Sequence, residues 1–572
     1  MSAGLIIFNM YSSSLVFISG CLIFMGMWLV EQGCSLVIEW QVGGMSSWIM
    51  SMSLVFDWMS VFFLGFVCLI SGCIMKYSDY YLEGEEHYKR FVFIMIGFVV
   101  SMWLLIISPN LVSLLLGWDG LGLTSYLLVV FYQSENSCNA GMLTVLSNRI
   151  GDVTILLSIA LMFGNGSWDF YEMSNKFSNW VLMLVMLSCF TKSAQMPFSA
   201  WLPAAMAAPT PVSALVHSST LVTAGVYVLI RFSSVMSSCG LSIVMLSVAS
   251  LTMMMAGVGA MLEMDMKKVV ALSTLSQLGM MIMIISVEMK ELAFFHLISH
   301  ALFKSSLFMC AGFMIHSMSG SQDGRNMSGF AMSSPALSIV LSSGNLALCG
   351  FPFLTAFYSK DFAMEYLISN SLNFSVIMMS VVGVGLTVSY SLRLLYMSAV
   401  SVSVSNSVSG FSDMKLKMSQ SVILLFGCSV VMGFFMYWVV VPMNGPVGLS
   451  DMGKNSLMVM MMISGVIMFM KMESSLQTKK FMKGLVNTML TSMWFMPFLS
   501  TKLVSKGFVD LGFSMLKGME GGWSEYYGAL GGRSILVKVS SLMQMMQSCM
   551  VVSGYLLTSV LSVGVFFLVQ WV

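Results

Sequence analysis

Ionisable residues that lie inside long apolar segments carry the chemistry in this sequence. They are Asp119, Arg149, Asp152, Lys192, His217, Asp265, Lys267, His296, His300, Lys304, Lys360 and Asp361. A charged side chain at the centre of a bilayer costs about 2.5–3.5 kcal/mol even on the most lenient scale. Such residues must therefore face one another or water, and a functional role is their default interpretation.

The spacing of these residues predicts how they group. His296, His300 and Lys304 recur every fourth residue, so on a helix they stack along one face. Arg149 and Asp152 are three residues apart and also share a face, where they are as well explained by a structural ion pair as by a functional one.

Amines, carboxylates and imidazoles in series form a proton relay. A lysine held in a medium of low dielectric gives up its proton more readily than one in water, and a nearby carboxylate opposes that effect. Histidine exchanges protons near neutral pH. Zinc binding by His296 and His300 is a less favoured alternative, because no third ligand is evident and Lys304 would repel the metal.

The composition is that of a membrane protein. Of the 572 residues, 58% are hydrophobic and 9% are charged, whereas an average soluble domain carries about 25% charged residues. This excludes a soluble enzyme, a nucleic-acid binder and a disordered chain. A spanning helix needs about 20 apolar residues, so the length predicts roughly 14–16 of them. The net charge of +1 gives no reason to expect an anionic partner.

The apolar runs give the positions of the expected helices, since a lipid-facing segment must satisfy its own backbone groups. The candidate spans are 4–30, 52–75, 91–107, 111–132, 141–163, 180–195, 212–231, 240–262, 268–287, 292–316, 335–350, 373–397, 419–441, 455–472 and 551–571.

Proline marks two expected breaks in these helices. Four of the 10 prolines, Pro197, Pro203, Pro209 and Pro211, follow Lys192, and Pro352 precedes Lys360. Proline breaks a helix, and a break at membrane depth is tolerated only where protein or water covers it. Broken segments of this kind are typical of transporters with inverted repeats. Ordinary loops between helices are the alternative.

The C-terminal tail is more polar than the rest. From about residue 479 the pattern predicts a long amphipathic helix on the membrane surface, anchored by the last span; an extramembrane loop is the alternative. Gly521-Gly522 and Gly531-Gly532 predict kinks. The 11 cysteines include no CxxC pair, and no complete dinucleotide fingerprint occurs. If redox energy drives this protein, the redox chemistry is expected on other chains.

Several long motifs resemble NADH–ubiquinone oxidoreductase chain 5, the antiporter-like membrane subunit of respiratory complex I. They run in family order over about residues 90–400. The motifs are Gly117–Gly122, Asn148–Asp152, Thr191–Pro197, Trp201–Met206, Ala208–Thr220, Asp265–Lys268, Ser273–Gly279, Phe295–Lys304 and Phe357–Asp361.

The resemblance implies two inverted repeats of five helices, each with a discontinuous helix, in an all-α polytopic bundle. It implies a hydrophilic axis through Lys192, Lys304 and Lys360, with Asp119 as the carboxylate beside the first lysine and His217 as the bridging histidine. Many members carry Glu where this chain has Asp119. Because aspartate is one methylene shorter, its contact with Lys192 is expected to need a water.

The resemblance also implies a division of the chain and a setting for it. The expected parts are N-terminal helices (1–90), a proton-translocation core (91–400), further helices (401–478), a lateral helix (479–550) and an anchor (551–572). No cofactor is expected on this chain; FMN, iron–sulfur clusters, NADH and ubiquinone are expected on other subunits, and bound lipid such as cardiolipin is compatible. The implied partners are the neighbouring antiporter-like chain 4 and accessory subunits, with no nucleic acid, in the mitochondrial inner membrane.

Two other functions stay open from the sequence. The same fold serves subunits of multi-subunit cation/proton antiporters, and a purely structural clamp would also hold neighbouring subunits. The lateral helix and the 62 methionines, which suggest an organelle-encoded chain, favour the respiratory subunit. The buried ionisable row argues against a clamp, which has no use for its desolvation cost.

Overall fold

The computed structural model describes residues 2–45, 48–165, 168–169, 178–318, 320–370, 373–400, 416–440, 451–474, 485–549 and 551–570. The chain divides into two compact units, Met1–Pro497 and Phe498–Val572. The predicted boundaries at residues 401 and 479 lie outside the described residues.

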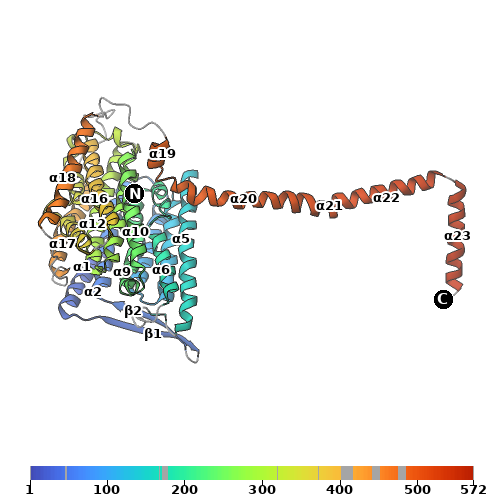
Figure 1. The fold of residues 1–572 in the computed structure, drawn as a ribbon, viewed down its shortest axis with the longest axis horizontal. Coiled ribbons are helices and arrows are strands. Elements are labelled where there is room, and N and C mark those ends of the chain that lie inside the picture. Colours follow the sequence, from blue (N-terminus) through green and yellow to red (C-terminus); the bar gives the residue numbers. More distant parts are fainter. Residues whose placement is uncertain are drawn as a thin grey trace. The chain divides into compact units, whose positions relative to one another are not determined.

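The first unit is a bundle of long helices lying side by side (Figure 1). The helices are α1 (Ser2–Gln32), α2 (Trp58–Tyr81), α3 (Tyr88–Ile107), α4 (Leu111–Val129), α5 (Glu135–Met162), α6 (Asn179–Lys192), α9 (Leu221–Ser238), α10 (Ser242–Leu262), α11 (Met266–Ser286), α12 (Lys290–Ser317), α14 (Pro335–Cys349), α15 (Phe362–Asn370), α16 (Phe374–Leu395), α17 (Leu416–Val440) and α18 (Asp451–Ser474). Short pieces joining them are η1 (Phe163–Asn165), η4 (Gly324–Asn326), α13 (Phe330–Ser333), η6 (Tyr396–Val400) and α19 (Leu485–Thr491).

The hydropathy of these helices fits a membrane. Within the described residues of the whole chain, 12 helices are long and apolar enough to span one, and three shorter apolar helices add to them. Each predicted span overlaps one of the helices. The predicted all-α polytopic bundle is confirmed.

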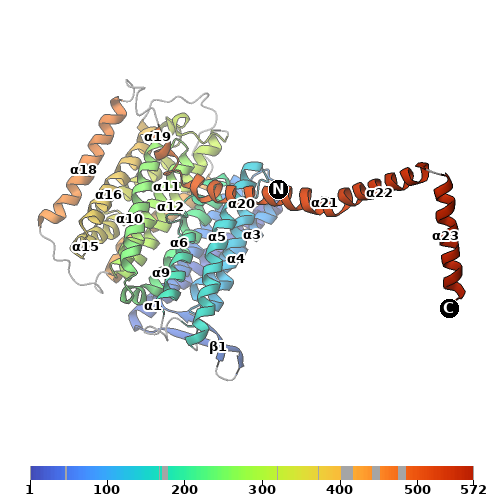
Figure 2. The same ribbon diagram turned by 45° about the vertical axis from the view of Figure 1, so that its right-hand side comes forward.

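Two strands that the hydropathy pattern does not reveal precede α2. β1 (Leu36–Met45) pairs antiparallel with β2 (Trp48–Phe56), and this hairpin lies across one end of the bundle (Figures 1 and 2). The predicted span 52–75 is therefore wrong at its start, because residues 52–56 form strand and α2 begins only after its N-cap Asp57. A short apolar run does not distinguish a strand from a helix.

Polar contacts attach the hairpin to the bundle. Asn110 Nδ2 donates to the Ser51 carbonyl oxygen at 2.9 Å, and Ser53 Oγ donates to Asp169 Oδ1 at 2.7 Å. Asn110 also caps the start of α4, where its side-chain oxygen accepts the N–H of Val112. One residue thus begins a helix and holds the strand in place.

The core of the bundle consists of α2, α9, α11 and α12, which are buried over nearly their whole length, whereas α1 and α17 are mostly exposed. Helices that are apolar all round belong in such a core. The residues expected to do chemistry lie on α12 and on segments packed against it, and on α4, α5 and α6, of which α5 packs against the other two.

The second unit is helical throughout its described residues. It consists of η8 (Phe498–Lys502), α20 (Leu503–Met515), the π-helix η9 (Leu516–Ser524), α21 (Glu525–Tyr527), α22 (Ala529–Cys549) and α23 (Val551–Gln570). Apolar side chains such as Phe508, Trp523 and Leu536 are exposed along it.

The glycines of this unit distort the helix, although not all where expected. Gly521 and Gly522 lie in the π-helix, but the break falls at Gly528 and not at Gly531-Gly532. A β-carbon at Gly531 would nevertheless collide with the Tyr526 carbonyl oxygen. Gly531 therefore accommodates the backbone of the break three residues before it.

Candidate functional site

The chain leaves regular helix in the two predicted places. α6 ends at Lys192, and only short pieces follow before the next long helix, α9, which starts at Leu221. The second interruption follows Gly350, which ends α14 with φ of 86°. The first interruption is largely buried in the bundle, whereas residues 351–353 of the second are exposed.

The first interruption is built from short pieces. They are α7 (Trp201–Ala204), η2 (Ala205–Ala207), α8 (Thr210–Val212) and the π-helix η3 (Ser213–Thr220), which leads into α9. The second ends in a further π-helix, η5 (Phe357–Asp361). π-helical turns frequently occur at functional sites, and these two carry His217 and Lys360.

Charged residues gather where α4, α5 and α6 meet. Arg149 Nη1 lies 3.2 Å from Asp152 Oδ2 and 3.8 Å from Asp119 Oδ1. Lys192 is fully buried; its Nζ donates to the Trp118 carbonyl oxygen at 3.1 Å and lies 4.9 Å from the centroid of the Trp118 ring. Asp152 and Asp119 both interact electrostatically with Lys192.

A direct ion pair between Lys192 and Asp119 is not among those formed by the described residues. Asp119 instead contacts Arg149, whose long side chain reaches the shorter aspartate. A contact between Lys192 and Asp119 through water stays a prediction. Gly151 brings Asp152 close to Lys192, because α5 and α6 approach so tightly that a β-carbon at Gly151 would collide with Thr191 Oγ1.

His217 lies in the π-helix η3, the last piece of the first interruption. The residue is 1% exposed, and neither ring nitrogen has a hydrogen-bond partner among the residues that the structure describes. The ring lies edge-on to that of Trp201, with 6.1 Å between the centroids. Buried polar atoms normally have a protein or water partner, so this ring is placed to bond ordered water.

Asp265 and Lys267, two of the candidate residues, have different partners. Asp265 Oδ2 pairs with Lys268 Nζ at 2.6 Å, and this pair is partly exposed. Lys267 is buried and donates to the Ala208 carbonyl oxygen at 3.2 Å. Consecutive residues of a helix point in different directions, so Lys267 faces the interruption while Lys268 faces outward.

The α12 side chains lie along one buried face, as their spacing predicts. His296 Nδ1 lies 2.9 Å from Ser359 Oγ and Nε2 lies 3.3 Å from Gln277 Oε1. The ring centroids of His296 and His300 are 6.3 Å apart, and within the described part of the chain neither His300 nitrogen has a hydrogen-bond partner.

Both remaining lysines are bound by neutral oxygens. Lys304 Nζ donates to Ser273 Oγ at 2.5 Å. Lys360 Nζ donates to the Leu348 carbonyl oxygen at 3.1 Å and to Thr387 Oγ1 at 2.6 Å. The Asp361 carboxylate borders Gly350, where a β-carbon would lie 3.4 Å from Oδ1.

Uncharged residues also contact these groups or lie beside them, and they are not revealed by the pattern of charged residues. They are Trp118, Ser273, Gln277, Ser359, Thr387 and Tyr390, whose hydroxyl lies 3.1 Å from Ser276 Oγ. A signal for part of this set was present, since Ser273, Ser276 and Gln277 lie three or four residues apart on the apolar helix α11.

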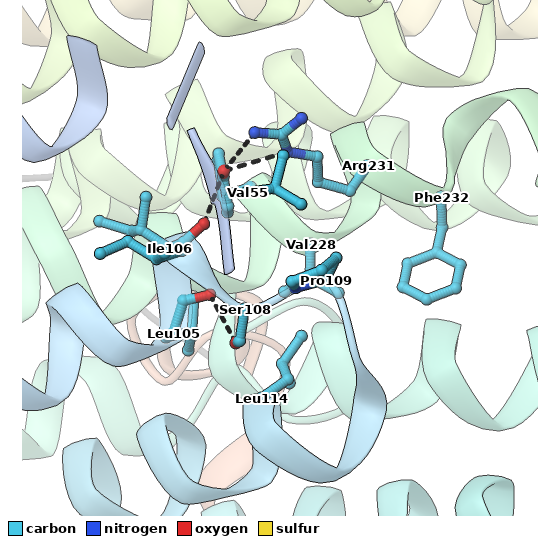
Figure 3. A pocket seen from close by; sticks show the side chains of 11 residues that line it. Val55, Leu105, Ile106, Ser108, Pro109, Leu114, Val228, Arg231 and Phe232 are labelled. Carbon is cyan, nitrogen blue, oxygen red and sulfur yellow. Dashed lines mark hydrogen bonds between the residues drawn. The ribbon is translucent and has the colours of Figure 1, made fainter. Parts of the chain in front are cut away.

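A further charged pair lies at the hairpin end. Arg231 Nη1 bonds Asp57 Oδ2 at 2.7 Å, while its Nε and Nη2 donate to the Tyr227 hydroxyl. Tyr227 in turn donates to the Ile106 carbonyl oxygen at 3.1 Å. Figure 3 shows Arg231 and Ile106 beside the small cavity that both line. This network connects α9 to the start of α2, through Asp57, and to the end of α3, through Ile106.

The arrangement can hold and pass protons. A hydroxyl can accept a proton on its oxygen while releasing its own, and an imidazole can accept one on one nitrogen while releasing one from the other. The three amines are buried, and the unpartnered nitrogens of His217 and His300 suit ordered water. Among the described residues, no three His, Cys, Asp or Glu side chains are grouped so as to hold a metal ion.

Family models match most of the chain. Residues 42–92 match the N-terminal model of NADH–ubiquinone oxidoreductase (complex I) chain 5. Residues 108–387 match the membrane model of NADH:quinone oxidoreductases and Mrp antiporters, and residues 390–570 match the C-terminal model of NADH dehydrogenase subunit 5.

Curated relatives match over nearly the full length. The NADH-ubiquinone oxidoreductase chain 5 of Aedes aegypti is 46% identical over 523 residues, which cover 90% of each chain. Its counterparts in Locusta migratoria and Lumbricus terrestris are 44% and 40% identical, and each match covers at least 88% of this chain and 90% of the relative.

Solved structures share the fold at lower identity. A chain of the Mrp complex from Dietzia sp. has a TM-score of 0.69 at 22% identity; the match covers 96% of this chain and 61% of that chain. A chain of the membrane-bound sulfane sulfur reductase, an archaeal respiratory membrane complex, has a TM-score of 0.64 at 19% identity.

Three findings indicate the same family: 46% identity to a relative over 90% of each chain, three matching family models and a fold shared with a chain of the Mrp complex. The chain belongs to the NADH–ubiquinone oxidoreductase chain 5 family, the antiporter-like membrane-arm subunits of the proton-translocating NADH:ubiquinone oxidoreductase.

Proposed function

We propose that the buried row of this subunit carries protons across the mitochondrial inner membrane while other subunits oxidise NADH and reduce ubiquinone. The proposed relay members are Asp119, Lys192, His217, His296, His300, Lys304, Lys360 and Asp361, with Arg149, Asp152, Asp265 and Lys267 in supporting roles. FMN and iron–sulfur clusters are proposed on other subunits, and cardiolipin as a bound lipid.

One observation carries this proposal: three fully buried amines are bound by neutral oxygens. Lys192, Lys304 and Lys360 have no carboxylate within ion-pair distance among the described residues. A buried lysine with a purely structural role would be paired, since an uncompensated buried charge costs several kcal/mol. An amine held by carbonyl and hydroxyl oxygens can release its proton and keep its place.

In this proposal, the charges around Lys192 control its proton. Arg149 lies between two carboxylates, and a movement of its guanidinium group toward Asp152 leaves Asp119 less neutralised. The changed field favours either the charged or the neutral amine of Lys192. The released proton passes through water to one nitrogen of His217, and the other nitrogen releases one onward toward Lys304.

From the α12 face the proton continues toward the second interruption. Along this path, His300 lies one helical turn from Lys304 and His296 one turn farther toward the start of α12. Ser359 connects the His296 ring to the segment that carries Lys360. Asp361, beside Gly350, is the proposed last group before the exposed residues 351–353.

The exposed surface of α4 and α5 is suited to contact a neighbouring membrane subunit, which we propose is the antiporter-like chain 4. Asp119 and Arg149 are 36% and 46% exposed there, next to the exposed apolar residues Leu116, Leu146 and Ile150. An ion pair facing lipid directly would be costly. A partner that covers this surface and accepts polar contacts removes that cost, and accessory subunits are proposed along the remaining surface.

A second candidate function is cation/proton exchange within a multi-subunit antiporter. The likeness in fold to a chain of the Mrp complex favours it. It predicts ion exchange in the absence of NADH, whereas the respiratory function predicts proton movement only during NADH oxidation.

The test is Lys192→Met in the assembled membrane complex. Methionine keeps most of the side-chain volume and removes the titratable amine, so we expect normal assembly and a loss of NADH-driven proton translocation of about a hundredfold or more, the lower end of the usual range for removing a proton-transfer group. Lys268→Met is the control, because that lysine pairs with Asp265 at a partly exposed site. A Lys192→Met complex that pumps normally would disprove the relay.

A further inference from the structure

Two buried hydroxyl groups that the proposed relay does not use meet near the end of the bundle opposite the hairpin. Tyr77 on α2 is 0% exposed, and Thr210 at the start of α8 is 1% exposed. The two hydroxyls interact with each other, and within the part of the chain that the structure describes neither has a second hydrogen-bond partner. A pair of hydroxyls keeps capacity for further hydrogen bonds, and leaving a buried donor or acceptor unsatisfied costs about 1–3 kcal/mol.

Gly312 on α12 makes the space in which these hydroxyls meet. A β-carbon at this position would lie 2.5 Å from the Tyr77 hydroxyl oxygen and 2.7 Å from Thr210 Oγ1. Real β-carbons do not approach other atoms so closely. The position therefore requires glycine to keep a polar space open between α2, α8 and α12.

Aromatic and imidazole groups connect this space to the outer end of α12. The rings of Tyr77 and Tyr81 are stacked at 5.9 Å, and the Tyr81 ring contacts that of His316 at 5.7 Å. His316 is exposed and Tyr81 is half-buried, so exposure decreases from His316 to Tyr77. Gly312 is four residues from His316, which is about 6 Å along a helix.

On its inner side the space adjoins the first interruption. Thr210 is two residues from Ala208, whose carbonyl oxygen accepts the bond from the buried amine of Lys267. Lys304 lies on α12 eight residues before Gly312, about 12 Å along the helix. The hydroxyl pair thus lies between the helix end and the buried amines.

We infer that Tyr77, Thr210 and Gly312 form a polar passage through which protons move between the His316 end of α12 and the first interruption. This rests on the proposed function, since a passage is useful only if the buried row carries protons. The assignment adds proton-conducting hydroxyls on α2 and α8 to the relay.

The passage needs no net chemistry. The Tyr77 oxygen accepts a proton on a lone pair while its own hydroxyl proton moves to Thr210 or to a water beside it, and Thr210 repeats the exchange. Each hydroxyl is regenerated when its O–H bond rotates back. Neither residue becomes charged for longer than the transfer, so the low dielectric of the site imposes little cost.

The experiment compares three variants that alter the passage in different ways. Tyr77→Phe removes one hydroxyl and keeps the ring, Thr210→Val removes the other and keeps the side-chain shape, and Gly312→Ala fills the space. Tyr88→Phe is the matched control, because Tyr88 lies at the start of α3, is half-buried and packs against Phe8 away from the passage. Proton uptake per NADH oxidised is measured in vesicles holding the whole complex, with assembly checked on native gels.

We expect Tyr77→Phe and Thr210→Val each to assemble normally and to lower the rate of proton translocation at least threefold, with Tyr88→Phe unchanged. If both hydroxyl variants pump normally while Lys192→Met does not, the passage is wrong and the relay stands. A loss seen only in Gly312→Ala would also overturn the passage, since steric disturbance alone explains it. Normal pumping in Lys192→Met and in both hydroxyl variants would disprove the proposed function itself.

Discussion

The Nζ atom of Lys360 lies 3.1 Å from the carbonyl oxygen of Leu348, at the end of α14. The last carbonyls of a helix have no partner within it and carry partial negative charge. The Lys360 ammonium group satisfies one of them, and it donates a second hydrogen bond to Thr387 Oγ1 on α16 at 2.6 Å. The proposed proton carrier is therefore also a helix cap, so its protonation is coupled to the end of α14.

Replacing Thr387 tests how the Lys360 amine is held. We expect Thr387→Val to lower proton translocation about tenfold or more, because a hydrogen bond to a charged group contributes about 1.5–3 kcal/mol. The rate of acidification in vesicles measures the effect. Ser380→Ala on the same helix is the control, since the Ser380 hydroxyl is buried and donates to the Ile377 carbonyl. Equal rates in the two variants would contradict the assigned role of Thr387.

The two carboxylates that share Arg149 are expected to differ in importance. The Asp152 side chain is 9% exposed and 3.2 Å from Arg149, whereas that of Asp119 is 36% exposed and 3.8 Å away. Breaking a buried ion pair costs about 3–5 kcal/mol. Asp152→Asn should therefore reduce the amount of assembled complex more than Asp119→Asn, as measured on native gels. The reverse order would show that Asp119 is the main partner of Arg149.

The pair of Arg231 and Asp57 is expected to stabilise the bundle. Its side chains are only 11% and 17% exposed, and Arg231 also binds the Tyr227 hydroxyl. We expect Arg231→Met to lower the thermal stability of the complex, with a loss of about 3 kcal/mol or more. Arg325→Met should have almost no effect, because its pair with Asp323 is exposed on both sides and such pairs contribute about 0–1 kcal/mol.

Truncation after Pro497 removes the second compact unit. The bundle keeps its own core, so we expect it to fold and to remain in the membrane. The removed unit exposes apolar side chains such as Phe508, Trp523 and Leu536, which we expect to bind other subunits. The shortened chain should therefore be recovered with fewer neighbouring subunits after detergent extraction. Full recovery of those subunits would rule out a clamping role for the tail.

Much of the fold followed from the sequence by itself. Nearly every spanning helix was predicted to within a few residues, because lipid offers no partner for the backbone and any long apolar run must become a helix. The stack of His296, His300 and Lys304 also followed, since their separation of four residues places them on one face whatever the helix packs against. The two interruptions followed from proline.

Only the tertiary structure decided which groups meet. Asp119 contacts Arg149 instead of Lys192, and Lys267 binds the Ala208 carbonyl instead of Asp265. These choices depend on side-chain length and on how closely helices approach, as at Gly151, where contact between α5 and α6 leaves no room for a β-carbon. The hairpin also needed the structure, because an apolar run of strand length fits either conformation until its partner is known.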